Sequence, residues 1–119
     1  MSQPPITLYG IPNCDTVKKA RKWLEANGIA FRFHDFRKDG LEQAEVKQWL
    51  EALGWETVLN RKGTTWRNLP ESIRSNAVDA SSILPLLVEQ PTLIKRPVLV
   101  AGDTVHCGFK EADYQSLLK

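Results

Sequence analysis

The first third of the chain carries a strand, a helix and a second strand joined by short connections, and this order restricts the fold more than any other feature. An apolar run over residues 6–9 predicts a strand, which Gly10 and Pro12 end because proline cannot donate to a strand ladder. A helical pattern follows over 15–27, and residues 30–35 alternate apolar and polar side chains like a half-buried strand. Such a unit forms a right-handed crossover, so the two strands are predicted to be parallel.

Cys14 occupies the junction between the first strand and this helix, at or next to the helix N-cap. Unpaired backbone N–H groups point outward there, and the helix macrodipole places partial positive charge at that end. The position therefore favours the thiolate, which is the reactive form of cysteine. Cys14 could instead be a small buried hydrophobe, a common fate of free cysteine. Its place at a strand-to-helix turn, beside Pro12 and Asn13, favours the reactive interpretation.

Length and composition limit the class of protein. The 119 residues suffice for one domain with a core, and 42% hydrophobic and 25% charged residues are typical of a soluble globular protein. A net charge of +2 gives no strong attraction to nucleic acid or to a membrane surface. Residues 1–5 lack the apolar core of a signal peptide, and two cysteines without a secretion signal indicate a reducing compartment. We therefore expect a single cytoplasmic domain over residues 1–119, with no nucleic-acid or membrane partner.

The middle of the chain, about residues 38–92, is predicted to be a helical block, because apolar residues recur there at helical spacing and glycine or proline separates the segments. The helices expected in it cover 41–53, a short stretch within 64–76, and a segment that Ser81 or Ser82 caps and that ends before Pro91.

Two strands and a helix are predicted after this block. Residues 96–101 are apolar on both faces, as in a central strand. Gly102 and Asp103 form a two-residue hairpin signal that leads to a strand over 104–107, and a final helix is expected over 111–118. The order is strand–helix–strand, helical block, strand–strand–helix, which predicts an α/β fold with a mixed four-stranded sheet.

This order, with a cysteine after the first strand and a proline that opens a later strand, resembles the thioredoxin fold. More narrowly, it is similar to the arsenate reductase/Spx (ArsC-like) family, in which a helical insertion precedes the proline. Three stretches carry the resemblance, residues 9–14, 59–62 and 94–97. With the helical residues between them, they cover nearly the whole chain.

The resemblance implies a thiol site in which Arg61 and Arg96 lie near Cys14. It also implies that Pro97 follows a cis peptide bond and presents its neighbouring backbone to a glutathione-like substrate. Topology supports part of this, because a strand over 98–101 antiparallel to the first strand puts Pro97 next to Cys14. The predicted site consists of Cys14 as the nucleophile, with Pro12, Asn13, Arg61, Arg96 and Pro97 as residues that bind substrate or glutathione.

The chain departs from the family pattern at three positions. Arsenate reductases of the family carry a third arginine just after the strand that ends at Cys107, where this chain has Gly108. They also carry a histidine where this chain has Gly10. Spx-type regulators carry a Cys-x-x-Cys switch, whose second position here is Val17. The chain therefore resembles most the YffB-like branch, whose members are proposed to be glutathione-dependent thiol reductases.

Cys107 is expected to be an inert core residue. In the proposed sheet it lies two strands from the first strand, about 9–10 Å sideways. Bridged cysteines rarely have Cα atoms more than about 7 Å apart, so a disulfide between Cys14 and Cys107 is not expected. The two cysteines and two histidines lack zinc-ligand spacing, so no metal site is expected.

The function predicted from these features is a thiol–disulfide oxidoreductase, a monomer that uses Cys14 as its single nucleophile and glutathione as co-substrate. Its other partner would be an unknown disulfide or glutathionylated substrate. One alternative is an Spx-like regulator that binds RNA polymerase. Another is an arsenate reductase with an incomplete arginine set.

Overall fold

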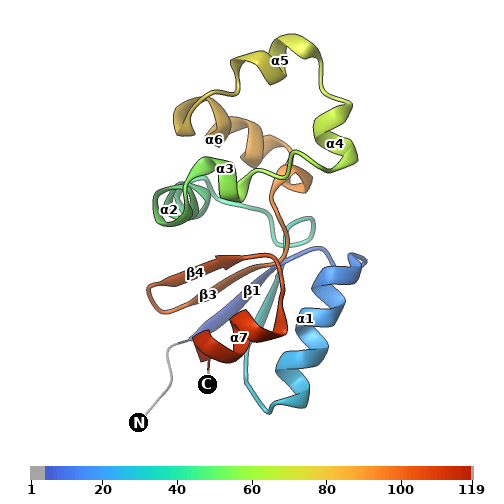
Figure 1. Cartoon of the computed structure of the whole chain (residues 1–119), viewed down its shortest axis with the longest axis vertical. Helices are drawn as coiled ribbons and strands as arrows, with labels where there is room; N and C mark the ends of the chain where they lie inside the picture. Colours follow the sequence, from blue (N-terminus) through green and yellow to red (C-terminus); the bar gives the residue numbers. More distant parts are fainter. Residues whose placement is uncertain (1–4, 119) are drawn as a thin grey trace. The chain divides into compact units, whose positions relative to one another are not determined.

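The computed structural model describes residues 5–118, which fall into two compact units (Figure 1). One unit contains the chain up to Asp39 and from Arg96 onward, and the other is Gly40–Lys95. Residues 1–4, on which most of the signal-peptide expectation rests, lie outside the described range. Every helix within that range is too short or too polar to cross a membrane. That residues 1–119 form one domain stays a prediction.

The first unit is a four-stranded mixed sheet with two helices. The strands have the order β2-β1-β3-β4, with β1 parallel to β2, β3 antiparallel to β1, and β4 antiparallel to β3 (Figure 1). The strand–helix–strand and strand–strand–helix halves therefore form the predicted thioredoxin-like arrangement. The elements are β1 (Ile6–Gly10), α1 (Asp15–Ala26), β2 (Arg32–Asp35), β3 (Val98–Ala101), β4 (Thr104–Cys107) and α7 (Glu111–Leu118).

The core of this unit lies where α1 and α7 pack on the sheet. Buried residues of β1, β3 and both helices form one cluster: Ile6, Leu8, Ala20, Leu24, Leu99 and Tyr114. The α1 helix follows the predicted pattern, because Val17 also belongs to its buried face. Sequence placed the second strand too early, at residue 30, since pairing with β1 begins only at Arg32, opposite Thr7. The predicted hairpin at Gly102 and Asp103 is confirmed by the pairing of the residues that flank it.

The second unit is helical. Its elements are α2 (Gln43–Leu53), α3 (Trp55–Val58), α4 (Thr64–Arg67), α5 (Glu71–Asn76), α6 (Ala80–Glu89) and the 3₁₀ turn η1 (Pro91–Leu93). The single short helix expected within 64–76 is two helices. An antiparallel bridge joins Leu59, which follows α3, to Ile94, which follows η1, and the Asn60 N–H donates to the Leu93 carbonyl at 2.8 Å.

The predicted cap of α6 is wrong. The N-cap is Asp79, whose carboxylate accepts a hydrogen bond from the Ser82 N–H at 2.9 Å, while the Ser82 hydroxyl lies 3.2 Å from the Asp79 N–H. Ser82 is therefore the third residue of a capping box, in which both side chains satisfy helix-end N–H groups. Pro85 consequently lies inside the helix, beyond the first turn. Proline costs no hydrogen bond in the first turn, because the N–H groups there have no partner within the helix, but at Pro85 one such bond is lost.

Candidate active site

Cys14 is the N-cap residue of α1. The loop that leaves β1 turns at Pro12 and Asn13, and the Cys14 N–H donates to the Ile11 carbonyl at 3.2 Å. The Cys14 carbonyl in turn accepts from the Lys18 N–H at 2.9 Å, which begins the helix. The Cys14 side chain makes no capping hydrogen bond to a described residue and is partly exposed. The sulfur therefore stands at the positive end of the helix dipole, within reach of solvent.

Gly10 and Val17 determine how closely α1 approaches the end of β1. A Cβ atom added at Gly10 would lie 2.8 Å from Cγ2 of Val17, closer than side-chain carbons approach in proteins. Val17, in the first turn of α1, is itself fully buried. Gly10 and Val17, two of the three positions at which this chain departs from the family pattern, are thus packed side by side.

Pro97 lies at the same end of the sheet as the cysteine loop. The antiparallel register pairs Tyr9 with Val98, so the start of β3 lies beside the end of β1, as the sequence predicted. The Arg96–Pro97 peptide bond, which the resemblance implies to be cis, is cis. Pro97 is buried, and its carbonyl accepts a hydrogen bond from the Gly108 N–H at 2.8 Å. That the partly buried Arg96 side chain reaches the Cys14 sulfur stays a prediction.

Arg61 belongs to the helical unit. Its guanidinium lies 3.8 Å from the Glu56 carboxylate and 5.7 Å from the ring centroid of Trp55, and half of its side chain is exposed. It borders a cavity of about 410 Å³ that contains three cationic side chains and one carboxylate. The residues around it are Glu56, Thr57, Leu59, Asn60, Arg61, Lys62 and Lys95. That the Arg61 guanidinium lies near Cys14 stays a prediction.

The sequence did not predict Lys95 as a neighbour of Arg61. The two residues line the same cavity because the Lys95 N–H donates to the Val58 carbonyl at 2.8 Å, next to the Leu59–Ile94 bridge. Val58 and Lys95 are far apart in the sequence, so this pairing has no short-range sequence signal.

Cys107 is buried on β4, two strands from β1, as predicted. Cys14 and Cys107 are the two cysteines of the chain; both lie within the described residues, and neither is in a disulfide. The Tyr114 ring packs nearby, edge-on to Phe109 with centroids 4.7 Å apart. Burial raises the pKa of Tyr114, and the neighbouring Cys107 adds to this rise. Across residues 5–118, no group of three potential ligands from His, Cys, Asp and Glu is placed to hold a metal.

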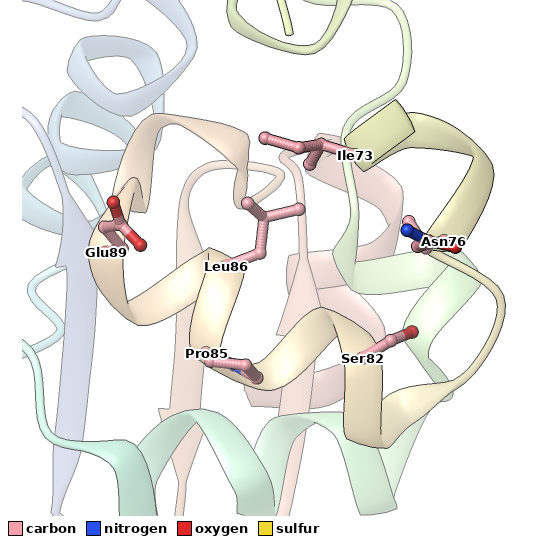
Figure 2. A pocket seen from close by; sticks show the side chains of 7 residues that line it. Ile73, Asn76, Ser82, Pro85, Leu86 and Glu89 are labelled. Carbon is pink, nitrogen blue, oxygen red and sulfur yellow. The ribbon is translucent and has the colours of Figure 1, made fainter. Parts of the chain in front are cut away.

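A second cavity, of about 300 Å³, lies between α5 and α6 (Figure 2). Figure 2 shows Ile73 and Leu86 pointing toward each other across it. Its other lining residues are Asn76, Ala77, Ser82, Pro85 and Glu89. This lining has no thiol and no cation, so it supplies none of the groups that thiol chemistry on an anionic peptide requires.

The chain is similar to several known proteins. Residues 9–117 match the ArsC family. An uncharacterised protein of Haemophilus influenzae is 46% identical over 93% of this chain and 96% of its own length. The global transcriptional regulator Spx of Streptococcus agalactiae serotype V is 29% identical over 95% of this chain and 82% of its own length. Among solved structures, the YFFB protein has a TM-score of 0.92 at 42% identity, covering 96% of this chain and 99% of that protein.

Proposed function

The chain belongs to the ArsC family, and from this premise we propose that it is a glutathione-dependent thiol–disulfide reductase with a single nucleophilic cysteine. The YFFB protein, which is 42% identical, shares its fold. The observation that carries the proposal is the position of Cys14, a free and partly exposed thiol at the N-terminus of α1. Val17 stands one turn further on, buried, where a resolving thiol would be needed for an intramolecular disulfide.

The reaction consists of two thiol–disulfide exchanges. In the first, the Cys14 thiolate attacks the glutathione sulfur of a glutathionylated substrate. A bond between Cys14 and glutathione forms, the substrate S–S bond breaks, and the substrate thiolate leaves and takes a proton from water. In the second, the thiolate of free glutathione attacks the glutathione sulfur of this mixed disulfide. Glutathione disulfide leaves, and the Cys14 thiolate is restored. One substrate disulfide and one glutathione thiol thus become one substrate thiol and one glutathione disulfide.

The remaining predicted residues would bind the peptide part of glutathione. Pro12 and Asn13 are exposed in the loop before Cys14, and the backbone next to Pro97 borders the same end of the sheet. Arg96 and Arg61 would hold the glutathione carboxylates by charge-assisted hydrogen bonds. A guanidinium offers two parallel donors in a fixed geometry, so lysine would be a poor replacement at either position. The concentration of cationic groups around Arg61 supports this assignment.

The test is turnover of a glutathionylated peptide, measured as release of the peptide thiol at several glutathione concentrations. We expect the rate to depend on glutathione and to vanish in Cys14→Ser. Intact mass of the protein after one exchange should show a glutathione adduct, and proteolytic mapping should locate it on Cys14. An adduct on Cys107 instead would contradict the single-cysteine mechanism. The reaction is proposed to take place in the cytoplasm, with the protein acting as a monomer.

An Spx-like regulator is the second candidate, because similarity to the Spx protein of Streptococcus agalactiae extends over 95% of this chain. Such a protein would bind RNA polymerase and not turn over glutathione. A pull-down with purified polymerase separates the two: binding without peptide reduction would favour the regulator.

Arsenate reduction is the third candidate and has the least support. Gly108, where arsenate reductases of the family carry an arginine, has a φ of +83°. Glycine is favoured in this left-handed region because it has no Cβ, so the backbone here suits glycine better than arginine.

A further inference from the structure

A row of cationic side chains extends from Cys14 along the exposed side of α1. Residues four, seven and eight positions after a helix N-cap fall on one side of the helix. At these positions the chain has Lys18, Arg21 and Lys22, which we call the cationic stripe. Lys18 and Lys22 are exposed, Arg21 is partly buried, and Glu25 ends the stripe. A shallow hollow of about 180 Å³ lies among these four side chains.

The stripe occupies the middle turns of α1, and the last turn carries no basic residue. The macrodipole acts mainly on charges in the first and last turns, so the helix itself gains little stability from cations at these positions.

The positive charges of the stripe are not paired with carboxylates of the described residues. Glu25 is four residues after Arg21, a favourable spacing for an ion pair, yet within residues 5–118 no ion pair involves Lys18, Arg21 or Lys22. Arg21 is held by a different contact, because its guanidinium lies 4.4 Å from the ring centroid of Phe33 on β2. A cation stacked on an aromatic ring keeps its outer edge available for a carboxylate. The positive charge therefore faces solvent in a partly fixed arrangement.

We propose that the cationic stripe is the docking surface for an acidic segment of the protein whose glutathionylated cysteine reacts at Cys14. This proposal rests on the proposed function and names its substrate class. With a rise of 1.5 Å per residue, Lys18 and Lys22 lie about 6 Å and 12 Å along the helix from Cys14. An extended chain advances about 3.3 Å per residue, so these distances correspond to about two and four residues. The substrate is a cysteine with carboxylates two and four residues away.

The length of the stripe favours a protein segment over glutathione. An extended tripeptide spans about 10 Å, so glutathione linked to Cys14 would reach Lys18 but not Lys22. The carboxylate of Glu25 at the far end is unfavourable for a continuing row of phosphates, which argues against nucleic acid. A short acidic segment is long enough to contact the stripe as far as Lys22, and it can end before the carboxylate of Glu25.

The test uses three glutathionylated peptides that differ only two and four residues after cysteine, where they carry Glu, Gln or Lys. We expect the Glu peptide to exceed the Gln peptide about three- to tenfold in kcat/KM at low salt, and the difference to shrink at high salt. In the charge-reversed variant Lys18→Glu/Lys22→Glu the order should invert, with the Lys peptide fastest. Lys19→Glu is the matched control. It reverses one charge and is therefore compared with the single variant Lys18→Glu. Lys19 lies on the same helix but about 100° from Lys18 around the axis, so the order of the three peptides should persist.

A second readout does not depend on turnover. Alkylation of Cys14 by anionic iodoacetate, relative to neutral iodoacetamide, reports the local potential, and the ratio should fall more in Lys18→Glu than in Lys19→Glu. Equal rates for the three peptides would overturn the docking proposal and leave the reductase proposal standing. Absence of turnover with every peptide would overturn both. If the stripe variants lost binding to a DNA oligonucleotide but kept the peptide order, the surface would be a nucleic-acid site and the docking proposal wrong.

Discussion

Replacing Gly10 with alanine tests how α1 is seated on the sheet. The added Cβ would lie 2.8 Å from Cγ2 and 3.3 Å from Cγ1 of Val17. Carbon atoms in contact prefer separations of about 3.5–4.0 Å. Val17 cannot easily turn away, because it is fully buried and valine has one strongly preferred rotamer in a helix. The new methyl group must therefore displace the first turn of α1, and Cys14 with it.

The size of the effect follows from two opposing contributions. Overpacking of a close-packed core costs about 1–3 kcal/mol. Replacing glycine by alanine inside a strand recovers about 0.5–1 kcal/mol of backbone entropy. We therefore expect Gly10→Ala to lower the free energy of unfolding by about 1–2 kcal/mol, measured by urea denaturation under reducing conditions. In a chain of this size the midpoint of thermal unfolding should fall by roughly 4–8 °C.

The double variant Gly10→Ala/Val17→Ala isolates the contact. Removing the two methyl groups of Val17 destabilises the core by itself, but it also makes room for the methyl group at residue 10. The two substitutions should therefore be less destabilising together than the sum of their separate effects, by about 1 kcal/mol. Additive effects, or a Gly10→Ala protein as stable as the parent, would refute the packing described for these two residues.

Three further predictions concern the cysteines and the buried tyrosine. Val17→Cys should form an intramolecular disulfide with Cys14 on oxidation, seen as the loss of one free thiol, and turnover should then depend less on glutathione concentration. Cys107→Ser should retain peptide turnover but lose about 1–3 kcal/mol of stability in urea, because it buries a hydroxyl; loss of turnover in the folded variant would indicate a second reacting thiol. Tyr114→Phe should be as stable as the parent or more so at pH 7, because the Tyr114 hydroxyl has no hydrogen-bond partner within the described residues. Since burial raises the pKa of Tyr114 above its usual value near 10, its contribution to stability is retained below that pH and falls as the pH rises above it. The parent should thus lose more stability than Tyr114→Phe in alkaline urea titrations, and equal losses would contradict this assignment.

Two of the three strand pairings could be predicted because their determinants are local. The strand–helix–strand order fixes the parallel pair through the handedness of the crossover, and the Gly102–Asp103 turn fixes the register of the last two strands. Cys14 was found by the same means, since it stands where the periodicity changes from strand to helix. None of these inferences needs a contact between distant segments.

The helical unit was harder to predict because its details depend on such contacts. The four-residue helix α3 and the turn η1 are too short to show a periodic pattern. At α6, Asp79 and Ser82 are both good capping residues three positions apart, and sequence alone does not say which begins the helix. The ion pair between Arg61 and Glu56, and the approach of Lys95, likewise follow from the loop geometry and not from spacing.

The three departures from the family pattern affect backbone packing as well as chemistry. Gly10 leaves space that Val17 fills, so a larger residue at position 10 and valine at position 17 exclude each other. Gly108 combines a φ of +83° with a hydrogen bond to the Pro97 carbonyl, so a side chain there would strain the backbone next to the proline by about 1–2 kcal/mol. Restoring the arginine by Gly108→Arg alone should therefore lower stability before it adds an oxyanion ligand. In this chain the three positions therefore involve how the backbone packs near the cysteine loop and Pro97, as well as which charged groups are present.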